Sequence, residues 1–177
     1  MSQEGTKPSR TVDLGRLALD HGQGKRLEIE LRPAMVHLGG QQYGPVHEGS
    51  DGRLDVSRTS GGWALHLVFA TALAGPCVRC LEPAEFAIEV DAREVEEPEA
   101  ADEELRSPYF DGLEVDLGRW ANDALLLEMP LQPLCRLDCA GLCPVCGASL
   151  NDADPAEHEH GGRRDPRWAK LDELKLD

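Results

Sequence analysis

Apolar and charged residues alternate along residues 27–31 and again along residues 86–95. A period of two turns one set of side chains toward a core and the other toward solvent, so both segments are predicted to be half-buried β-strands. Residues 60–62, Ser-Gly-Gly, separate two further strand-like runs, 53–59 and 63–73, which predicts a β-hairpin. Glycines and a proline between these elements mark turns around one more short strand. The first half of the chain is therefore predicted to form an antiparallel sheet.

After residue 115 the apolar spacing lengthens to three or four residues. Apolar side chains at i, i+3, i+4, i+7 and i+8 share one face of a helix, and Asp116 can cap its first turn. These apolar positions are Leu117, Trp120, Ala121, Ala124 and Leu125. Pro130 and Pro133 cannot continue an α-helix. We predict a helix over residues 117–128 that packs on the sheet through its apolar face.

Acidic side chains dominate the chain, whose net charge is −15. The imbalance lies mainly in residues 91–116, with eleven acidic and two basic side chains, whereas residues 1–60 contain eight of each sign. Residues 94–104 hold few apolar groups and include Pro98, so they are predicted to form a flexible acidic loop. Two interpretations of such a loop stay open: it increases solubility, or it is a docking strip for a basic partner.

Six cysteines and a His-x-His pair are the strongest chemical signal in the sequence. They are Cys77 and Cys80, then Cys135, Cys139, Cys143 and Cys146, then His158 and His160. A closed zinc site takes four thiolate or imidazole ligands, so eight candidates suit two structural zinc ions. The first pair falls between two predicted strands and hence at a hairpin tip, where zinc-ribbon ligands are usually placed. Gly147, after the last cysteine, can adopt the positive φ that a ligand-bearing turn needs.

The cellular compartment decides whether clustered cysteines bind metal or form disulfides. Residues 1–20 are polar and contain no apolar signal core. The longest apolar stretch, residues 63–75, is interrupted by His66 and Thr71 and is shorter than the roughly 20 residues that a spanning helix needs. We therefore expect a soluble cytoplasmic protein. In a reducing cytosol its cysteines are expected to bind metal.

Three ligand arrangements are compatible with the spacing. One places the four clustered cysteines in one site, and the hairpin pair with the two histidines in another. A second joins the hairpin pair to Cys135 and Cys139, and the two later cysteines to the histidines. A third binds a single metal. We prefer the second, because Gly141 can turn the chain between the two sites and the eleven residues before His158 suit a finger-like loop.

Signatures of catalysis are missing from the sequence. It contains no Gly-rich phosphate loop, no Gly-x-Ser-x-Gly elbow and no His-Glu-x-x-His motif. The scattered histidines, interpreted as surface or core residues, are His21, His37, His47 and His66. A thioredoxin-like role would place the Cys77–Cys80 pair at the start of a helix, but Leu81-Glu-Pro83 follows it. We predict that the protein is not an enzyme and has no small-molecule substrate.

Several motifs occur in a fixed order along the chain. They are Cys-x-Arg-Cys-Leu at 77–81, an acidic stretch, Leu-Glu-Met-Pro-Leu-x-Pro-Leu-Cys at 127–135, Asp-Cys-Ala-Gly-Leu-Cys-Pro-Val-Cys-Gly at 138–147, Leu150-Asn151, and Asp165-Pro-Arg-Trp168 with Leu171. This set resembles the YceD family, whose members are linked in bacteria and plastids to accumulation of large-subunit ribosomal RNA. Many relatives have Cys-x-Cys after the Leu-Asn pair. This chain instead has His158-Glu-His160, which keeps two zinc ligands and changes the charge of the site.

The resemblance implies a non-enzymatic zinc-binding factor in ribosome assembly, acting on or near large-subunit ribosomal RNA or a pre-ribosomal particle. Relatives that lack the second cysteine turn can retain the hairpin pair and the ligands near 135–139, which implies two separable sites. Cations that could meet RNA are Arg136 and the terminal cluster Arg163, Arg164, Arg167 and Lys170. The alternative is a zinc-stapled adaptor that binds a basic protein, such as a ribosomal protein, without touching RNA.

These predictions combine into an α+β fold. It is an antiparallel β-sheet or partly open barrel with one covering helix and a C-terminal zinc-stapled module. Residues 1–10 are expected to be a disordered tail, residues 11–134 the sheet body, and residues 135–177 the zinc-binding module. Within the module, Asp165 and Pro166 are predicted to begin a short terminal helix with Trp168, Leu171 and Leu174 on one face.

Overall fold

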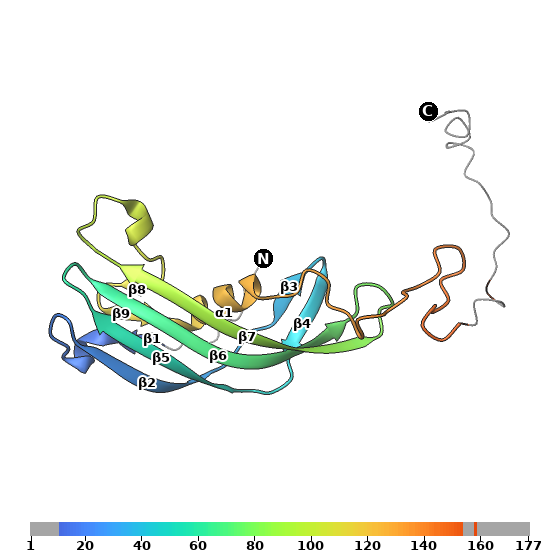
Figure 1. Ribbon diagram of the computed structural model, residues 1–177, viewed down its shortest axis with the longest axis horizontal. Helices are drawn as coiled ribbons and strands as arrows, with labels where there is room; N and C mark the ends of the chain where they lie inside the picture. The colour runs from blue at the N-terminus through green and yellow to red at the C-terminus, as the bar shows by residue number, and fades with distance from the viewer. Residues whose placement is uncertain (1–10, 154–157, 159–177) are drawn as a thin grey trace, which may run out of the picture.

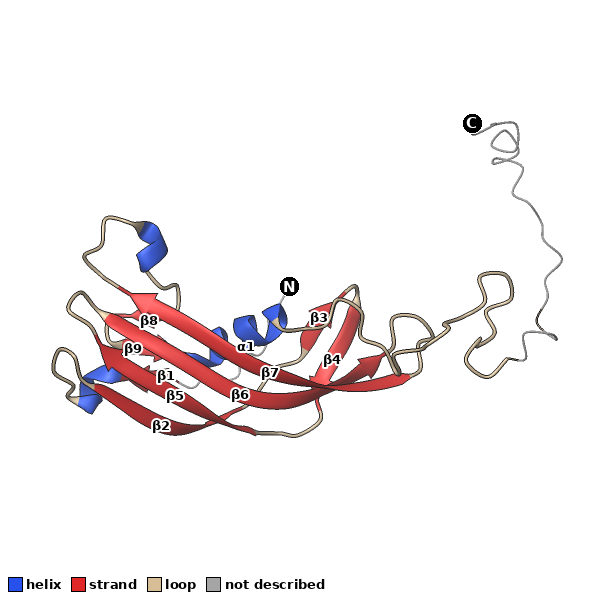
Figure 2. Cartoon of the chain, in the orientation of Figure 1, coloured by secondary structure: helices blue, strands red, loops and turns tan. Residues whose placement is uncertain are grey.

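The computed structural model describes residues 11–153 and residue 158. These residues form two antiparallel sheets and one α-helix (Figures 1 and 2). The larger sheet consists of β2 (Gly24–Leu31), β3 (Val36–Leu38), β4 (Gln41–Pro45), β5 (Ser50–Arg58), β6 (Trp63–Pro76) and β7 (Pro83–Glu96). The smaller sheet consists of β1 (Thr11–Asp13), β8 (Phe110–Asp111) and β9 (Glu114–Asp116). The helix is α1 (Leu117–Leu127), and short 3-10 turns are η1 (Leu14–Leu17) and η2 (Glu103–Leu105).

The larger sheet is built around one long hairpin. Strands β6 and β7 pair in register from Trp63 opposite Glu96 to Pro76 opposite Pro83, so the turn that carries Cys77 and Cys80 projects from the far end. The strand order is β2-β5-β6-β4-β3, and β7 lies on the other side of β6. Among the described strands, β2 and β7 do not pair, so the sheet does not close into a barrel. The predicted strands and the Ser-Gly-Gly hairpin are confirmed.

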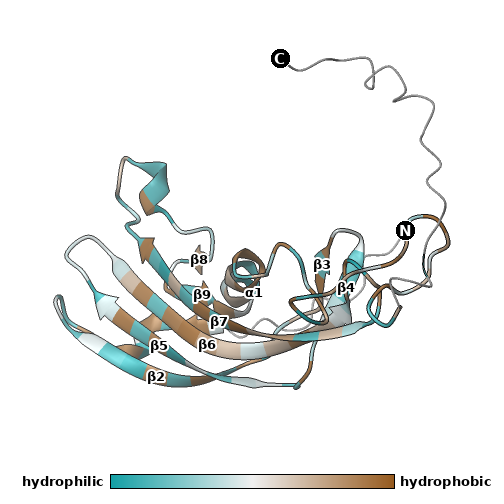
Figure 3. Cartoon of the chain, turned by 45° about the vertical axis from the view of Figure 1, so that its right-hand side comes forward, coloured by the Kyte–Doolittle hydropathy of each residue, from teal (hydrophilic) through white to brown (hydrophobic). Residues whose placement is uncertain are grey.

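Helix α1 packs on the concave face of the larger sheet (Figure 3). Its buried side chains are the predicted ones, Leu117, Trp120, Ala121, Ala124 and Leu125. They join the core formed by the inward positions of the strands, including Leu54, Leu67 and Val90. The Asp116 carboxylate accepts a hydrogen bond from the Arg119 N–H at 2.9 Å, which confirms the predicted cap. Neither α1 nor any other helix in the described part of the chain has the length and apolarity to cross a membrane.

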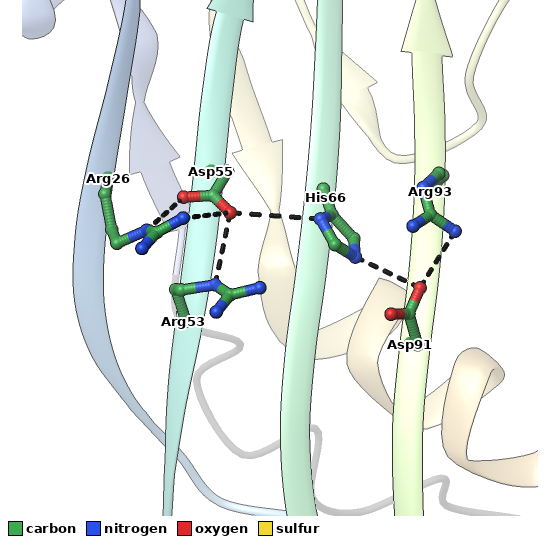
Figure 4. A network of polar contacts seen from close by, with 6 residues as sticks. All are labelled: Arg26, Arg53, Asp55, His66, Asp91 and Arg93. Carbon is green, nitrogen blue, oxygen red and sulfur yellow. Dashed lines mark hydrogen bonds and ion pairs between the residues drawn. The ribbon is translucent and has the colours of Figure 1, made fainter.

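Charged side chains cover the opposite, solvent-facing side of the sheet (Figure 4). Arg26 on β2 contacts Asp55 on β5 at 2.6 Å, and Asp55 lies 3.8 Å from His66 on β6. The other imidazole nitrogen of His66 lies 3.0 Å from Asp91 on β7, which also pairs with Arg93 at 2.9 Å. These contacts thus link polar and charged side chains of four neighbouring strands into one network. His66 is a surface residue of this network, as interpreted from the sequence.

The acidic segment is more structured than predicted at its beginning. Residues 94–96 belong to β7 and are not part of a loop. Glu96 is only 6% exposed, and its carboxylate accepts a hydrogen bond from the Ser107 N–H at 2.6 Å. The prediction of a loop over residues 94–104 therefore started three residues too early, because β6 offers pairing partners as far as Trp63. Helix α1 likewise ends one residue before its predicted end.

Candidate metal centre

Four cysteines meet at the end of the β6–β7 hairpin. Cys77 and Cys80 come from the hairpin turn, and Cys135 and Cys139 come from the segment that follows α1. Their sulfur atoms all lie within 4.8 Å of one another. Cys77, Cys80 and Cys139 are buried, together with Ala84, in a small cluster that is separate from the main core. In Figure 1 the segment after α1 passes this turn and continues beyond the end of the sheet.

The sulfur spacing fits a tetrahedral metal better than disulfides. The Sγ atoms of Cys77 and Cys139 are 3.7 Å apart, and those of Cys80 and Cys135 are 3.5 Å apart. A zinc ion bonded to four thiolates at about 2.3 Å has sulfur–sulfur edges of about 3.8 Å. A disulfide would need a separation of about 2.05 Å. The four thiols therefore fit a structural zinc ion in donor type, number and spacing.

The first knuckle, residues 77–82, and the second knuckle, residues 143–148, share one backbone pattern. In each, the first cysteine N–H donates to the carbonyl five residues on at 2.8 Å. The same cysteine's carbonyl accepts from the N–H four residues on, at 3.0 Å in the first knuckle and 2.8 Å in the second. The N–H two residues on points at the cysteine sulfur, at 3.5 Å from Arg79 and 3.4 Å from Val145. Both turns are thus folded to present two sulfurs on one side.

The fifth residue of each knuckle takes a left-handed backbone conformation. Gly147 has φ 74°, as predicted, and the equivalent residue of the first knuckle is Leu81 with φ 65°. A non-glycine residue in this region costs roughly 1–2 kcal/mol. Leu81 is 58% exposed, so its side chain offsets little of that cost by burial. The first knuckle is therefore stabilised by its own hydrogen bonds and by the contacts of its two cysteines with Cys135 and Cys139.

A second group of candidate ligands contains Cys143, Cys146 and His158. Their ligand atoms also lie within 4.8 Å of one another, and the Cys146 Sγ is 3.7 Å from the His158 Nε2. His160, the predicted fourth ligand, lies outside the described residues, as do Arg163, Arg164, Arg167 and Lys170. Thiolates and an imidazole are zinc ligands, so the donor set fits the same metal. Cys146 is exposed, in contrast to the buried first group.

Local hydrogen bonds lower the pKa of one thiol in each ligand group, which favours the thiolate form that binds metal. Burial raises the pKa of the Cys77 thiol, but N–H groups of Cys80, Arg79 and Cys135 outweigh it and bring the pKa to about 6. The N–H of Cys146, with help from His158, lowers the pKa of Cys143 to about 6. Burial and the neighbouring thiols raise the pKa of Cys135 to about 12. Metal binding would displace the remaining protons, so affinity should increase with pH.

The structure groups the ligands in the way that the preferred arrangement predicts. It brings Cys77 and Cys80 to Cys135 and Cys139, and it does not gather the four clustered cysteines in one place. Sequence reasoning missed the contacts that hold this grouping. Arg79 donates to the Cys139 carbonyl at 3.1 Å, and the Val78 N–H donates to the Pro133 carbonyl at 2.9 Å. The motif Cys-x-Arg-Cys-Leu contains Arg79, but nothing in the sequence indicates that Arg79 contacts the Cys139 carbonyl.

An open antiparallel sheet with two cysteine knuckles at one end defines a protein with candidate zinc-ribbon-like sites. Comparison with known proteins then identifies the family. Residues 65–175 match the sequence model described as "Large ribosomal RNA subunit accumulation protein YceD". The chain belongs to the YceD family.

Two relatives illustrate the extent of the similarity. An uncharacterised protein of Mycobacterium tuberculosis is 34% identical over 172 residues, which cover 93% of this chain and 80% of that protein. The maize protein "Large ribosomal RNA subunit accumulation protein YCED homolog 1, chloroplastic" is 28% identical over 131 residues, which cover 55% of this chain and 44% of the maize protein. No solved structure gives a significant match.

Proposed function

We propose that this protein is a non-enzymatic zinc-binding factor that supports accumulation of large-subunit ribosomal RNA in the cytoplasm. The observation that carries the proposal is that the family motifs and the two ligand groups fall on the same residues. The cysteine-bearing motifs that resemble the YceD family are the segments that converge as two ligand groups. The name of the maize relative, which matches part of this chain, gives the ribosomal RNA role.

The proposed metal role is structural. Cys77, Cys80, Cys135 and Cys139 would hold one zinc ion, and Cys143, Cys146, His158 and His160 would hold the second. Four protein ligands leave no coordination position for water or substrate, so such zinc ions cross-link the chain and do not activate a reactant. The cross-link matters here because the described hydrogen bonds between the segment after α1 and the hairpin turn come from two residues of the turn, Val78 and Arg79. It would hold residues 133–151 in a fixed shape for a partner.

RNA or a pre-ribosomal particle is the proposed partner. The cations proposed to meet phosphate are Arg163, Arg164, Arg167 and Lys170. Arg136 is a weaker candidate, since its guanidinium already donates to the Asn151 carbonyl at 3.0 Å and lies 3.5 Å from Asp138. Because the chain carries a net charge of −15, RNA contact should be confined to such a local cluster.

A complementation experiment tests the proposal. In a strain that lacks the gene, the wild-type protein should restore the ratio of large-subunit to small-subunit ribosomal RNA. Cys77→Ser should fail to restore it, whereas Val78→Ser, a change beside it that removes no ligand, should succeed. Native mass spectrometry of the wild type should show two zinc ions. A metal-free folded chain that restores the ratio would contradict the zinc role.

The partner is tested separately by crosslinking within purified pre-ribosomal particles. Arg163→Glu combined with Arg164→Glu and Arg167→Glu should weaken RNA crosslinks, and each lost phosphate contact should reduce the salt dependence by roughly 0.7 to 0.9 in slope. If these changes leave RNA association intact, the terminal cluster does not contact RNA. If the protein crosslinks only to a basic protein, the adaptor alternative replaces direct RNA contact.

A further inference from the structure

The second knuckle lies at the tip of a short hairpin, and this hairpin leads the chain back to the four cysteines of the first ligand group. The Cys143 N–H donates to the Ala148 carbonyl at 2.8 Å, and Leu142 bridges to Ser149. The Leu150 N–H then donates to the Gly141 carbonyl, also at 2.8 Å. The closed turn therefore brings the next residue, Asn151, beside Cys139.

Asn151 makes three contacts with the first ligand segment. Its Nδ2 donates to the Cys139 Sγ at 3.6 Å, and its Oδ1 accepts from the Ala140 N–H at 2.8 Å. Its backbone carbonyl accepts from the Arg136 guanidinium at 3.0 Å. A backbone N–H can only donate, so the Ala140 contact fixes which end of the amide faces the sulfur. The side chain thus presents an N–H to a sulfur of the first group.

We propose that Asn151 is a positioning residue that couples the two metal sites. The inference rests on the proposed binding of two zinc ions. The amide N–H stabilises the charge of the Cys139 thiolate and, with the Ala140 contact, fixes the direction in which that sulfur points. Metal at the second site closes the hairpin that delivers Asn151, so the second site strengthens the first. Because coupling between binding sites is reciprocal, metal at the first site strengthens the second by the same factor.

Among the contacts that the structure describes at Cys139, Asn151 is the one suited to this role. Arg79 also contacts this residue, through the Cys139 carbonyl at 3.1 Å. Arg79 belongs to the first knuckle, however, so its hydrogen bond to Cys139 does not pass through the second knuckle. Asn151 follows the second knuckle in the chain and reaches the first group through its side chain. A change at the second knuckle therefore reaches Cys139 through Asn151.

Metal affinity measured by chelator competition tests the role of the side chain. Cobalt(II) is the probe, because thiolate-to-cobalt charge-transfer absorption grows with the number of sulfur ligands and so distinguishes the four-cysteine site. Asn151→Ala should weaken this site by about 10- to 100-fold, the usual cost of losing a hydrogen bond to a metal ligand. Asn151→Asp should also weaken it while the carboxylate keeps the acceptor for Ala140. Asp152→Ala, at the exposed neighbouring residue, should leave it unchanged.

A double-mutant cycle tests the coupling. Cys146→Ser removes a ligand of the second site and should weaken the first site by a factor similar to Asn151→Ala. Combining the two changes should cost little more than either alone, because both remove the same contact. Fully additive losses, or no loss in Asn151→Ala, would overturn the coupling. Thermal unfolding of the sheet body should be unchanged in every variant. A wild-type protein that binds no metal in native mass spectrometry would instead refute the proposed zinc role.

Discussion

Cys77→Ser should detach the segment after α1 from the hairpin turn and leave the larger sheet folded. Cys77 is 0% exposed and lies in the small cluster with Cys80, Ala84 and Cys139. The main core contains Leu54, Leu67 and the apolar face of α1, and it shares no buried residue with that cluster. The loss of one ligand should therefore disrupt the cluster at the hairpin turn and leave the main core intact.

The expected size of the effect follows from what holds residues 133–139 in place. A structural zinc ion contributes on the order of 10 kcal/mol of apparent binding free energy, and serine is a poor substitute for a thiolate ligand. The described hydrogen bonds that remain between this segment and the hairpin turn run from the Val78 N–H to the Pro133 carbonyl at 2.9 Å and from Arg79 to the Cys139 carbonyl and to the Gln132 side chain, both at 3.1 Å. Each contributes about 1 kcal/mol. Three such bonds cannot replace the metal, so the segment should open.

Hydrogen exchange measured by mass spectrometry can locate this opening. In Cys77→Ser, amides of residues 77–83 and 133–151 should exchange rapidly, while those of β5 and β6 near Leu54 and Leu67 keep their protection. Val78→Ser serves as the matched control, because Val78 is partly exposed and has no ligand atom. Cys143→Ser should affect residues 141–153 more than the first knuckle. Loss of protection throughout β5 and β6 would refute the separation of the four-cysteine cluster from the main core, because the cluster and the sheet would then unfold together.

Three further predictions concern single side chains. Asp116→Ala removes the 2.9 Å cap on the Arg119 N–H and should lower the free energy of unfolding by about 1 kcal/mol in denaturant titrations; an unchanged value would contradict the cap. The hydrogen bond from Arg26 lowers the pKa of Asp55 (Figure 4), so its stabilisation is complete above the unfolded value of about 3.9 and lost as pH falls through the folded pKa. Asp55→Asn should flatten that acid limb in thermal melts, and an unchanged limb would contradict the assignment. Gly147→Ala, at φ 74°, should destabilise the second knuckle by about 1 kcal/mol and speed metal release to a chelator.

Features that depend on nearby residues could be predicted from the sequence. The cap at Asp116 and the apolar face of α1 follow from a spacing of three and four residues, and both are observed. The long β6–β7 hairpin follows from alternation and from the turn between its arms. The positive φ of Gly147 follows from the knuckle motif. Each of these is decided by local periodicity and turn chemistry, which single segments of sequence display.

The smaller sheet could not be predicted in this way. Thr11 pairs with Asp116, and the strands β1, β8 and β9 are only two or three residues long. Such short strands show no periodicity, and their pairing depends on how the rest of the chain brings the ends together. The burial of Glu96 was missed for a similar reason. Its hydrogen-bond partner, the Ser107 N–H, lies after a loop, and the amino-acid composition of that loop does not reveal the path of its backbone.

By itself, the sequence identified the candidate metal ligands and placed the first pair at a hairpin tip, where the structure has it. It left three groupings open, because thiol chemistry is the same in each. The tertiary structure brings Cys139 to Cys77 across 62 residues of sequence and Cys135 to Cys80 across 55, which is the grouping that the preferred arrangement proposes. The physical reason is the path of the chain after α1. The Pro133 carbonyl accepts the Val78 N–H, and that contact sets the next cysteines opposite the hairpin turn.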